Sequence, residues 1–101
     1  MSPAHPPIEV LHNEAGHRFE AVVDGELSRA NYRREGDVLY MVHTEVPRAQ
    51  QGRGIAAALV TAAIDYAREN ELKVAPVCSY VRAYMRRHPE SRAQLAPGYT
   101  L

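Results

Sequence analysis

The hydrophobic pattern of this chain changes its period at one short segment, Gln51-Gly52-Arg53-Gly54-Ile55-Ala56. Before it, residues 38–46 form a long apolar run that ends at Pro47 and is typical of a strand. After it, apolar residues recur at helical spacing, at Ile55, Ala56, Leu59, Val60, Ala63, Ile64 and Ala67. The segment therefore joins a strand directly to an amphipathic helix.

A turn of this kind is suited to bind an anion. The first N–H groups of a helix have no partner within the helix, and the helix dipole favours negative charge at that end. Gly52 and Gly54 have no Cβ, so a ligand can approach the main chain closely. We therefore predict a phosphate or pyrophosphate site at this turn.

The residues before the turn predict an antiparallel meander of strands over 8–11, 17–23, 26–34 and 38–46. Asp24-Gly25 is a two-residue hairpin signal, and Glu35-Gly36-Asp37 predicts another turn. We expect Phe19, Ala21 and Val23 to share one face of their strand. In the next strand we expect Leu27 and Tyr32 to make the apolar contacts.

The residues after the long helix predict a short strand over 73–77, a second helix over 80–87 and an irregular end from Ser91 onward. The short strand runs parallel to 38–46 if the helix is a crossover, and Pro76 places it at an edge or interrupts it. Asn70 can end the first helix, and His88-Pro89 closes the second. The fold class is therefore α/β, with an N-terminal antiparallel meander followed by a β-α-β-α unit that contains one parallel strand pair.

The composition predicts one domain over residues 8–101, preceded by a proline-rich flexible arm over 1–7. No apolar run is long enough to span a membrane, and the N-terminus does not resemble a signal peptide. The single cysteine excludes an internal disulfide and favours a cytoplasmic location. Since 12 basic residues balance 12 acidic ones, the net charge gives no reason to expect a nucleic-acid partner.

Other glycine-rich phosphate sites fit this sequence less well. Residues 52–57 match the loose G-x-G-x-x-A form of a dinucleotide fingerprint, but the next strand ends in Val77-Cys78-Ser79, where that fingerprint requires an acid. The Gly-Lys-Ser/Thr of a Walker A loop is missing. A plain strand–helix connection, in which the glycines only fit the turn, stays open.

The segment from Gln51 to Ala56 resembles the Q/R-x-x-G-x-G/A motif of the GCN5-related N-acetyltransferases, which bind acetyl-CoA. His43-Thr44-Glu45-Val46-Pro47 and Cys78-Ser79-Tyr80-Val81-Arg82-Ala83-Tyr84-Met85-Arg86-Arg87-His88-Pro89-Glu90 also resemble the small single-domain branch of that superfamily. The resemblance covers about residues 8 to 92. It implies the mixed sheet of that superfamily, acetyl-CoA as cosubstrate and no metal.

The resemblance also implies where the cosubstrate lies. The pyrophosphate would lie on the backbone of Gln51, Gly52, Arg53, Gly54, Ile55 and Ala56, and the pantetheine arm along Val46 and its neighbours Thr44 and Glu45. Arg53 either adds a charge-assisted contact to phosphate or is a solvated arginine.

Candidate catalytic residues lie on both sides of the turn. Glu45 is the candidate general base, with a carboxylate less acidic than usual if the strand end is desolvated; otherwise it is an exposed Glu paired with an arginine. His43 lies on the same strand face, as base, proton relay or structural histidine. Tyr84 is the candidate proton donor to the CoA thiolate, although Tyr80 shares its helix face.

Cys78 precedes the second helix, and a cysteine at this place looks catalytic in the small branch, as transient acetyl acceptor or acid/base group. The helix start can lower the pKa of its thiol. The alternative is a small buried apolar residue.

The activity that the resemblance implies is acetyl transfer from acetyl-CoA to a primary amine, of a small molecule or of a lysine-bearing acceptor. The chain has no room for the pair of helices that commonly shapes the acceptor site in larger members. It could therefore also be a non-catalytic CoA-binding sensor or partner-binding module, and a homodimer could supply the missing elements. Arg82, Arg86 and Arg87 contact the CoA 3′-phosphate or an acidic substrate, or form a solvated helix face.

Overall fold

Five strands form one mixed sheet in the computed structural model, which describes residues 8–101. The strands are β1 (Leu11–Asn13), β2 (Arg18–Val23), β3 (Glu26–Glu35), β4 (Val38–Glu45) and β5 (Lys73–Pro76), and they lie side by side in that order. The first four are antiparallel, and β5 pairs with β4 in parallel. The predicted fold class is confirmed, whereas the expected arm, residues 1–7, lies outside the described residues.

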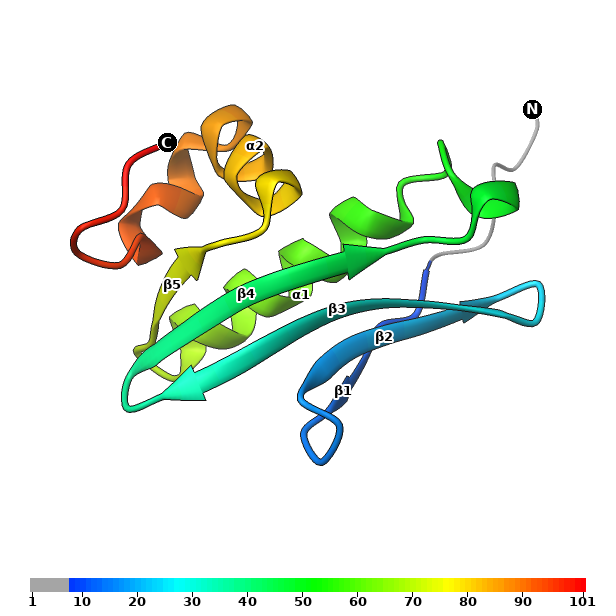
Figure 1. Ribbon diagram of the computed structural model, residues 1–101, viewed down its shortest axis with the longest axis horizontal. Coiled ribbons are helices and arrows are strands. Elements are labelled where there is room, and N and C mark those ends of the chain that lie inside the picture. The colour runs from blue at the N-terminus through cyan, green and yellow to red at the C-terminus, as the bar shows by residue number, and fades with distance from the viewer. Residues whose placement is uncertain (1–7) are drawn as a thin grey trace.

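Helix α1 (Ile55–Glu69) follows β4 and lies across one face of the sheet, as Figure 1 shows. Helix α2 (Ser79–Arg87) follows β5 and packs against α1, β4 and β5. Two 3₁₀ segments complete the order, η1 (Arg48–Gln50) before the glycine turn and η2 (Pro89–Gln94) after α2. The crossover β4-α1-β5 is the unit that positions the glycine turn at the end of β4.

The hairpin between β2 and β3 turns at Asp24-Gly25, as predicted. Both residues have positive φ, 52° and 78°, and Val23 pairs with Glu26 across the turn. Asp and Gly tolerate this left-handed backbone better than most residues, which explains why the pair fixes the register. The first strand begins at Leu11 rather than residue 8, because Ile8 and Val10 pack against the core outside the strand ladder.

The sheet buries the face that meets α1. Phe19 and Ala21 lie on that face of β2, and Val23 packs beside them, as expected. The expectation for β3 is half wrong, since Tyr32 is buried but Leu27 is exposed. Side chains alternate between faces along a strand, so positions 27 and 32 project from opposite faces, and Ser28 and Ala30 are buried beside Tyr32 instead.

The apolar stripe of α1 is buried against this sheet face. Its buried residues are Ile55, Leu59, Val60, Ala63, Ile64 and Ala67, so of the predicted stripe only Ala56 is partly exposed. The helix ends at Asn70, whose side-chain amide donates to the carbonyl of Tyr66 at 2.9 Å. The predicted helix and its end are therefore confirmed.

The C-terminal segment is more ordered than the sequence indicated. It forms η2, and then Leu95 bridges to Val74 on the free side of β5 while the Ala96 amide donates to the Val74 carbonyl at 2.8 Å. The prediction of an irregular end from Ser91 is wrong there, because these backbone groups cover the edge of β5. None of the helices within residues 8–101 is long and apolar enough to cross a bilayer.

Candidate active site

The turn between β4 and α1 has the geometry of an anion site. Gly52 and Gly54 have positive φ values of 85° and 82°, which side chains with a Cβ adopt only at a cost. Gly54 is the N-cap of α1 and carries no capping side chain, and the first turn contains no acidic residue. The first amides of α1 are thus left to whatever ligand approaches the turn.

These amides border a cleft of about 430 Å³, within the usual size range of small-molecule sites. Its lining residues are Thr44, Val46, Gln50, Gln51, Gly52, Gly54, Ile55, Ala56 and Tyr80. The structure therefore brings together seven of the nine residues that we predicted to hold CoA, all except Glu45 and Arg53. Gln50 and Tyr80 are additional lining residues that the motif did not indicate.

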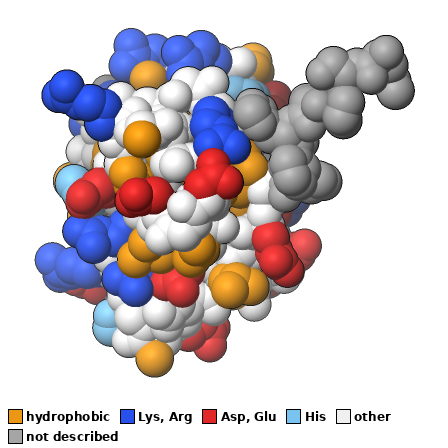
Figure 2. All heavy atoms as spheres, turned by 90° about the vertical axis from the view of Figure 1, so that its right-hand side faces the viewer, with side chains coloured by type: hydrophobic (Ala, Val, Ile, Leu, Met, Phe, Trp, Pro, Cys, Tyr) orange, Lys and Arg blue, Asp and Glu red, His pale blue; other side chains and the backbone are white. Residues whose placement is uncertain are grey.

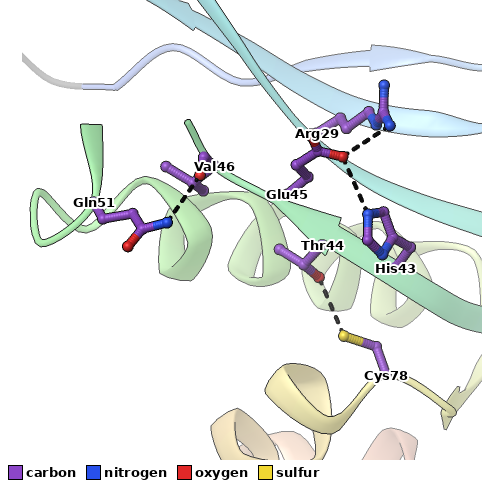
Figure 3. Close-up of polar contacts among 7 residues, drawn as sticks. All are labelled: Arg29, His43, Thr44, Glu45, Val46, Gln51 and Cys78. Carbon is purple, nitrogen blue, oxygen red and sulfur yellow. Dashed lines mark hydrogen bonds and ion pairs between the residues drawn. The ribbon is translucent and has the colours of Figure 1, made fainter. Parts of the chain in front are cut away.

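Strands β4 and β5 part beside this cleft. Their pairing extends only from Val38–Lys73 to Met41–Pro76, so within residues 8–101 the last four residues of β4 have no ladder partner on the β5 side. The side-chain amide of Gln51 reaches back to the residue after β4 and donates a hydrogen bond to the Val46 carbonyl at 3.2 Å (Figure 3). An extended ligand arm could lie along the unpaired backbone between the two strands.

Cys78 lies where the chain leaves β5 and enters α2. Its amide donates to the Met41 carbonyl at 2.8 Å, and its Sγ lies 3.6 Å from Thr44 Oγ1 on the side of β4 that faces α2 (Figure 3). Burial raises the pKa of the thiol, but hydrogen bonds from Thr44 and from the amides of Val81 and Tyr80 outweigh it, and the net pKa is lowered. The expected direction of this shift is confirmed.

Glu45 lies on the other side of β4, between His43 and Arg29. Its carboxylate is 2.9 Å from Arg29 Nη2 and 3.2 Å from His43 Nε2 (Figure 3). Its side chain is 56% exposed, and the hydrogen bond from His43 and the charge of Arg29 lower its pKa. Of the two alternatives for Glu45, the exposed glutamate paired with an arginine is confirmed and the desolvated, less acidic carboxylate is wrong, because the two neighbours stabilise the charged form.

The two tyrosines of α2 occupy different environments. Tyr84 is buried, its hydroxyl lies 2.6 Å from Thr61 Oγ1 on α1, and its ring stacks on His88 with centroids 3.9 Å apart. Tyr80 lines the cleft, and burial raises the pKa of its hydroxyl above its usual value. Of the two, only Tyr80 is placed to reach a ligand in the cleft.

Arg53 is not among the residues that line the cleft. Its Nη1 donates to Asp24 at the β2–β3 turn (2.8 Å) and to Gln50 (2.6 Å). Of the three arginines of α2 considered above, Arg82 donates to the carbonyls of Pro76 and Val77 at 3.4 Å. Within residues 8–101 no group of three or more His, Cys, Asp or Glu side chains is arranged to hold a metal ion.

Comparison with known proteins agrees with this geometry. Residues 18–95 match the family model of the GCN5-related N-acetyltransferases, and the chain belongs to that family. It is 37% identical to Protein NATD1 of Homo sapiens over 86 residues, which cover 82% of this chain and 76% of that protein. Protein NATD1 of Gallus gallus is also 37% identical, over 82% of this chain and 78% of that protein.

The fold is shared with a solved structure. A GCN5-like protein from Staphylococcus aureus, determined by NMR in solution, matches with a TM-score of 0.66 over 87% of each chain at 22% sequence identity. The family and the fold that the sequence motifs implied are thereby confirmed.

Proposed function

We propose that this protein binds acetyl-CoA in the cleft at the start of α1 and transfers the acetyl group to a primary amine, of a small molecule or of a lysine side chain. The observation that carries the proposal is the uncapped start of α1, where two left-handed glycines open the backbone amides onto a cleft. Membership of the family supports the same cosubstrate.

The cleft offers contacts for both halves of the proposed cosubstrate. The pyrophosphate would accept hydrogen bonds from the amides of the first turn of α1, where the helix dipole adds to the attraction. The pantetheine arm would lie along the unpaired end of β4, beside Thr44 and Val46. Its thioester end would then come close to Cys78, which contacts Thr44.

His43 is the better base of the two residues at the end of β4. In its neutral form, the ring nitrogen that faces Glu45 carries the proton, so Nδ1 holds the lone pair that can accept a proton from the amine. Glu45, with its lowered pKa, is a weak base but a good anchor for the imidazolium that forms. Arg29 holds the Glu45 carboxylate from the neighbouring strand.

In the transfer, the amine nitrogen attacks the thioester carbonyl carbon, a C–N bond forms, and the C–S bond then breaks. The amine approaches between the parted strands from the side of β4 that carries His43, so its proton passes to His43, and the CoA sulfur takes a proton from the Tyr80 hydroxyl. Cys78 offers a second route, because a thiolate can accept the acetyl group first and pass it to the amine afterwards.

A CoA-release assay over polyamines, amino acids, aminoglycosides and lysine peptides tests the proposal. At least one amine should release CoA above the rate without acceptor, and His43→Gln should lower that rate about a hundredfold or more. His17→Gln is the matched control, since His17 lies in the turn before β2. Tight CoA binding with no turnover on any amine would favour the non-catalytic CoA-binding module.

A further inference from the structure

The glycine turn is tied to a distant part of the chain. Arg53, between the two left-handed glycines, donates from Nη1 to the Asp24 carboxylate, 29 residues earlier, at 2.8 Å. The same nitrogen donates to Gln50 Oε1 at 2.6 Å, and the Gln50 side chain is buried. One guanidinium thus joins the tip of the β2–β3 hairpin, the η1 segment and the turn.

Both ends of this contact have fixed backbones. Asp24 and Gly25 form the hairpin turn with positive φ, and the hairpin is held by the full ladder between β2 and β3. Gln50 is held by its amide, which donates to the Pro47 carbonyl at 2.8 Å. The turn at Gly52-Arg53-Gly54, by contrast, has two residues with the greatest backbone freedom, so it gains most from an external anchor.

Arg53 lies outside the lining of the cleft, although it stands between two glycines that line it. The Arg53 side chain is only 23% exposed. Charged side chains of both signs are interspersed over the visible part of this end of the molecule (Figure 2). Binding of phosphate must therefore depend on how the backbone amides of the turn are arranged.

We propose that Asp24 is a positioning residue for the cosubstrate site, which acts through Arg53 to hold the glycine turn in its phosphate-binding conformation. Arg53 serves the cleft as an anchor and not as a phosphate ligand. This inference rests on the acetyl-CoA site proposed above. It extends the site to the β2–β3 hairpin, whose residues lie outside the Gln51–Ala56 motif.

The test is a double-mutant cycle on CoA affinity with Asp24→Asn and Arg53→Gln. Asn tolerates the left-handed backbone at position 24, so Asp24→Asn removes the charge without forcing a new turn. It should weaken CoA binding about two- to fivefold, as expected for a partly exposed ion pair. Arg53→Gln should weaken it about tenfold, because Gln50 then also loses its donor.

The cycle distinguishes anchor from ligand. If Arg53 is an anchor, Asp24→Asn has no further effect in the Arg53→Gln background, and Arg53→Lys, which keeps a charged donor, restores most of the affinity. If Arg53 binds phosphate, Asp24→Asn leaves the affinity unchanged or raises it, and the proposal is overturned. Asp65→Asn is the matched control, since it removes the Asp65–Arg68 pair from the exposed side of α1 and should leave CoA affinity unchanged.

A second readout separates this proposal from the function on which it rests. In the ligand-free protein, Asp24→Asn should lower the backbone ¹⁵N order parameters at residues 52–54 and leave those of the α1 core unchanged. If wild-type protein does not bind CoA, the proposed function fails, and these order parameters alone decide whether the anchor exists. Unchanged order parameters at residues 52–54 would overturn the anchor.

Discussion

Gly54→Ala is the sharpest perturbation of the proposed site, because the structure separates its two effects. A Cβ at position 54 would meet no heavy atom of residues 8–101 within 4 Å, so the substitution causes no clash with that part of the chain. It does force alanine into a backbone with φ of 82°. A left-handed alanine costs roughly 1–2 kcal/mol, and the free energy of unfolding should fall by that amount if the turn keeps its shape.

The effect on binding should be larger than the effect on stability. Gly54 lines the cleft, so in the proposed complex the added methyl group would hinder the approach of the phosphate, and relief of the backbone strain would reorient the amides of the turn. Loss of one hydrogen bond to a charged group costs about 1.5–3 kcal/mol, which is roughly a ten- to hundredfold rise in the Kd for CoA. Isothermal titration calorimetry measures this rise, and urea unfolding measures the stability.

Gly36→Ala is the matched control for this prediction. Gly36 also has positive φ, 61°, and open space at its Cβ position, but it lies in the β3–β4 turn at the opposite end of β4. It should lose a similar free energy of unfolding and bind CoA as the wild type does. If both variants bind CoA equally well, the left-handed turn at Gly54 does not hold the cosubstrate and the reasoning fails.

Three further predictions concern single side chains. If the acetyl group passes through Cys78, Cys78→Ala should lower kcat at least about tenfold with the Kd for CoA nearly unchanged, and wild-type turnover by this variant would remove Cys78 from the chemistry. Tyr80→Phe should lower kcat about a hundredfold, whereas Tyr84→Phe should instead cost about 1 kcal/mol of stability through its lost bond to Thr61; the reverse pattern would contradict the assignment. Burial lowers the pKa of His12, so its contribution to stability is complete above the unfolded pKa of about 6.5 and is lost as the pH falls through the lower folded value. Unfolding followed from pH 7.5 to 5 should show part of this decline missing in His12→Gln, and an identical decline would refute the attribution.

Local signals were enough to predict most of the fold. The change of hydrophobic period at Gly52-Arg53-Gly54 located α1 and its buried stripe, and Asp24-Gly25 located the β2–β3 turn. The prediction for Leu27 was wrong because it considered only that the residue is apolar and ignored the alternation of side chains along a strand. A residue five positions from Tyr32 lies on the opposite face of the sheet.

The site was harder to predict because its contacts are not local. Tyr80 and Tyr84 share a helix face, so the sequence does not show which of them is buried. The structure shows that the Tyr84 hydroxyl contacts Thr61 on α1. Glu45 follows an apolar strand, but Arg29 on β3 reaches it across the sheet and lowers its pKa. The contact of Arg53 with Asp24 likewise depends on the hairpin register and leaves no signal in the sequence around the turn.

The central claim is that acetyl-CoA binds at the glycine turn, and an NMR titration of ¹⁵N-labelled protein with acetyl-CoA tests it most directly. Saturable shifts should be largest at the amides of residues 52–56, at the end of β4 from Thr44 to Val46, and at Cys78 and Tyr80. The amides of the β3–β4 turn at the opposite end of β4 should not move. Absence of shifts at millimolar acetyl-CoA, or shifts centred away from the turn, would contradict the account.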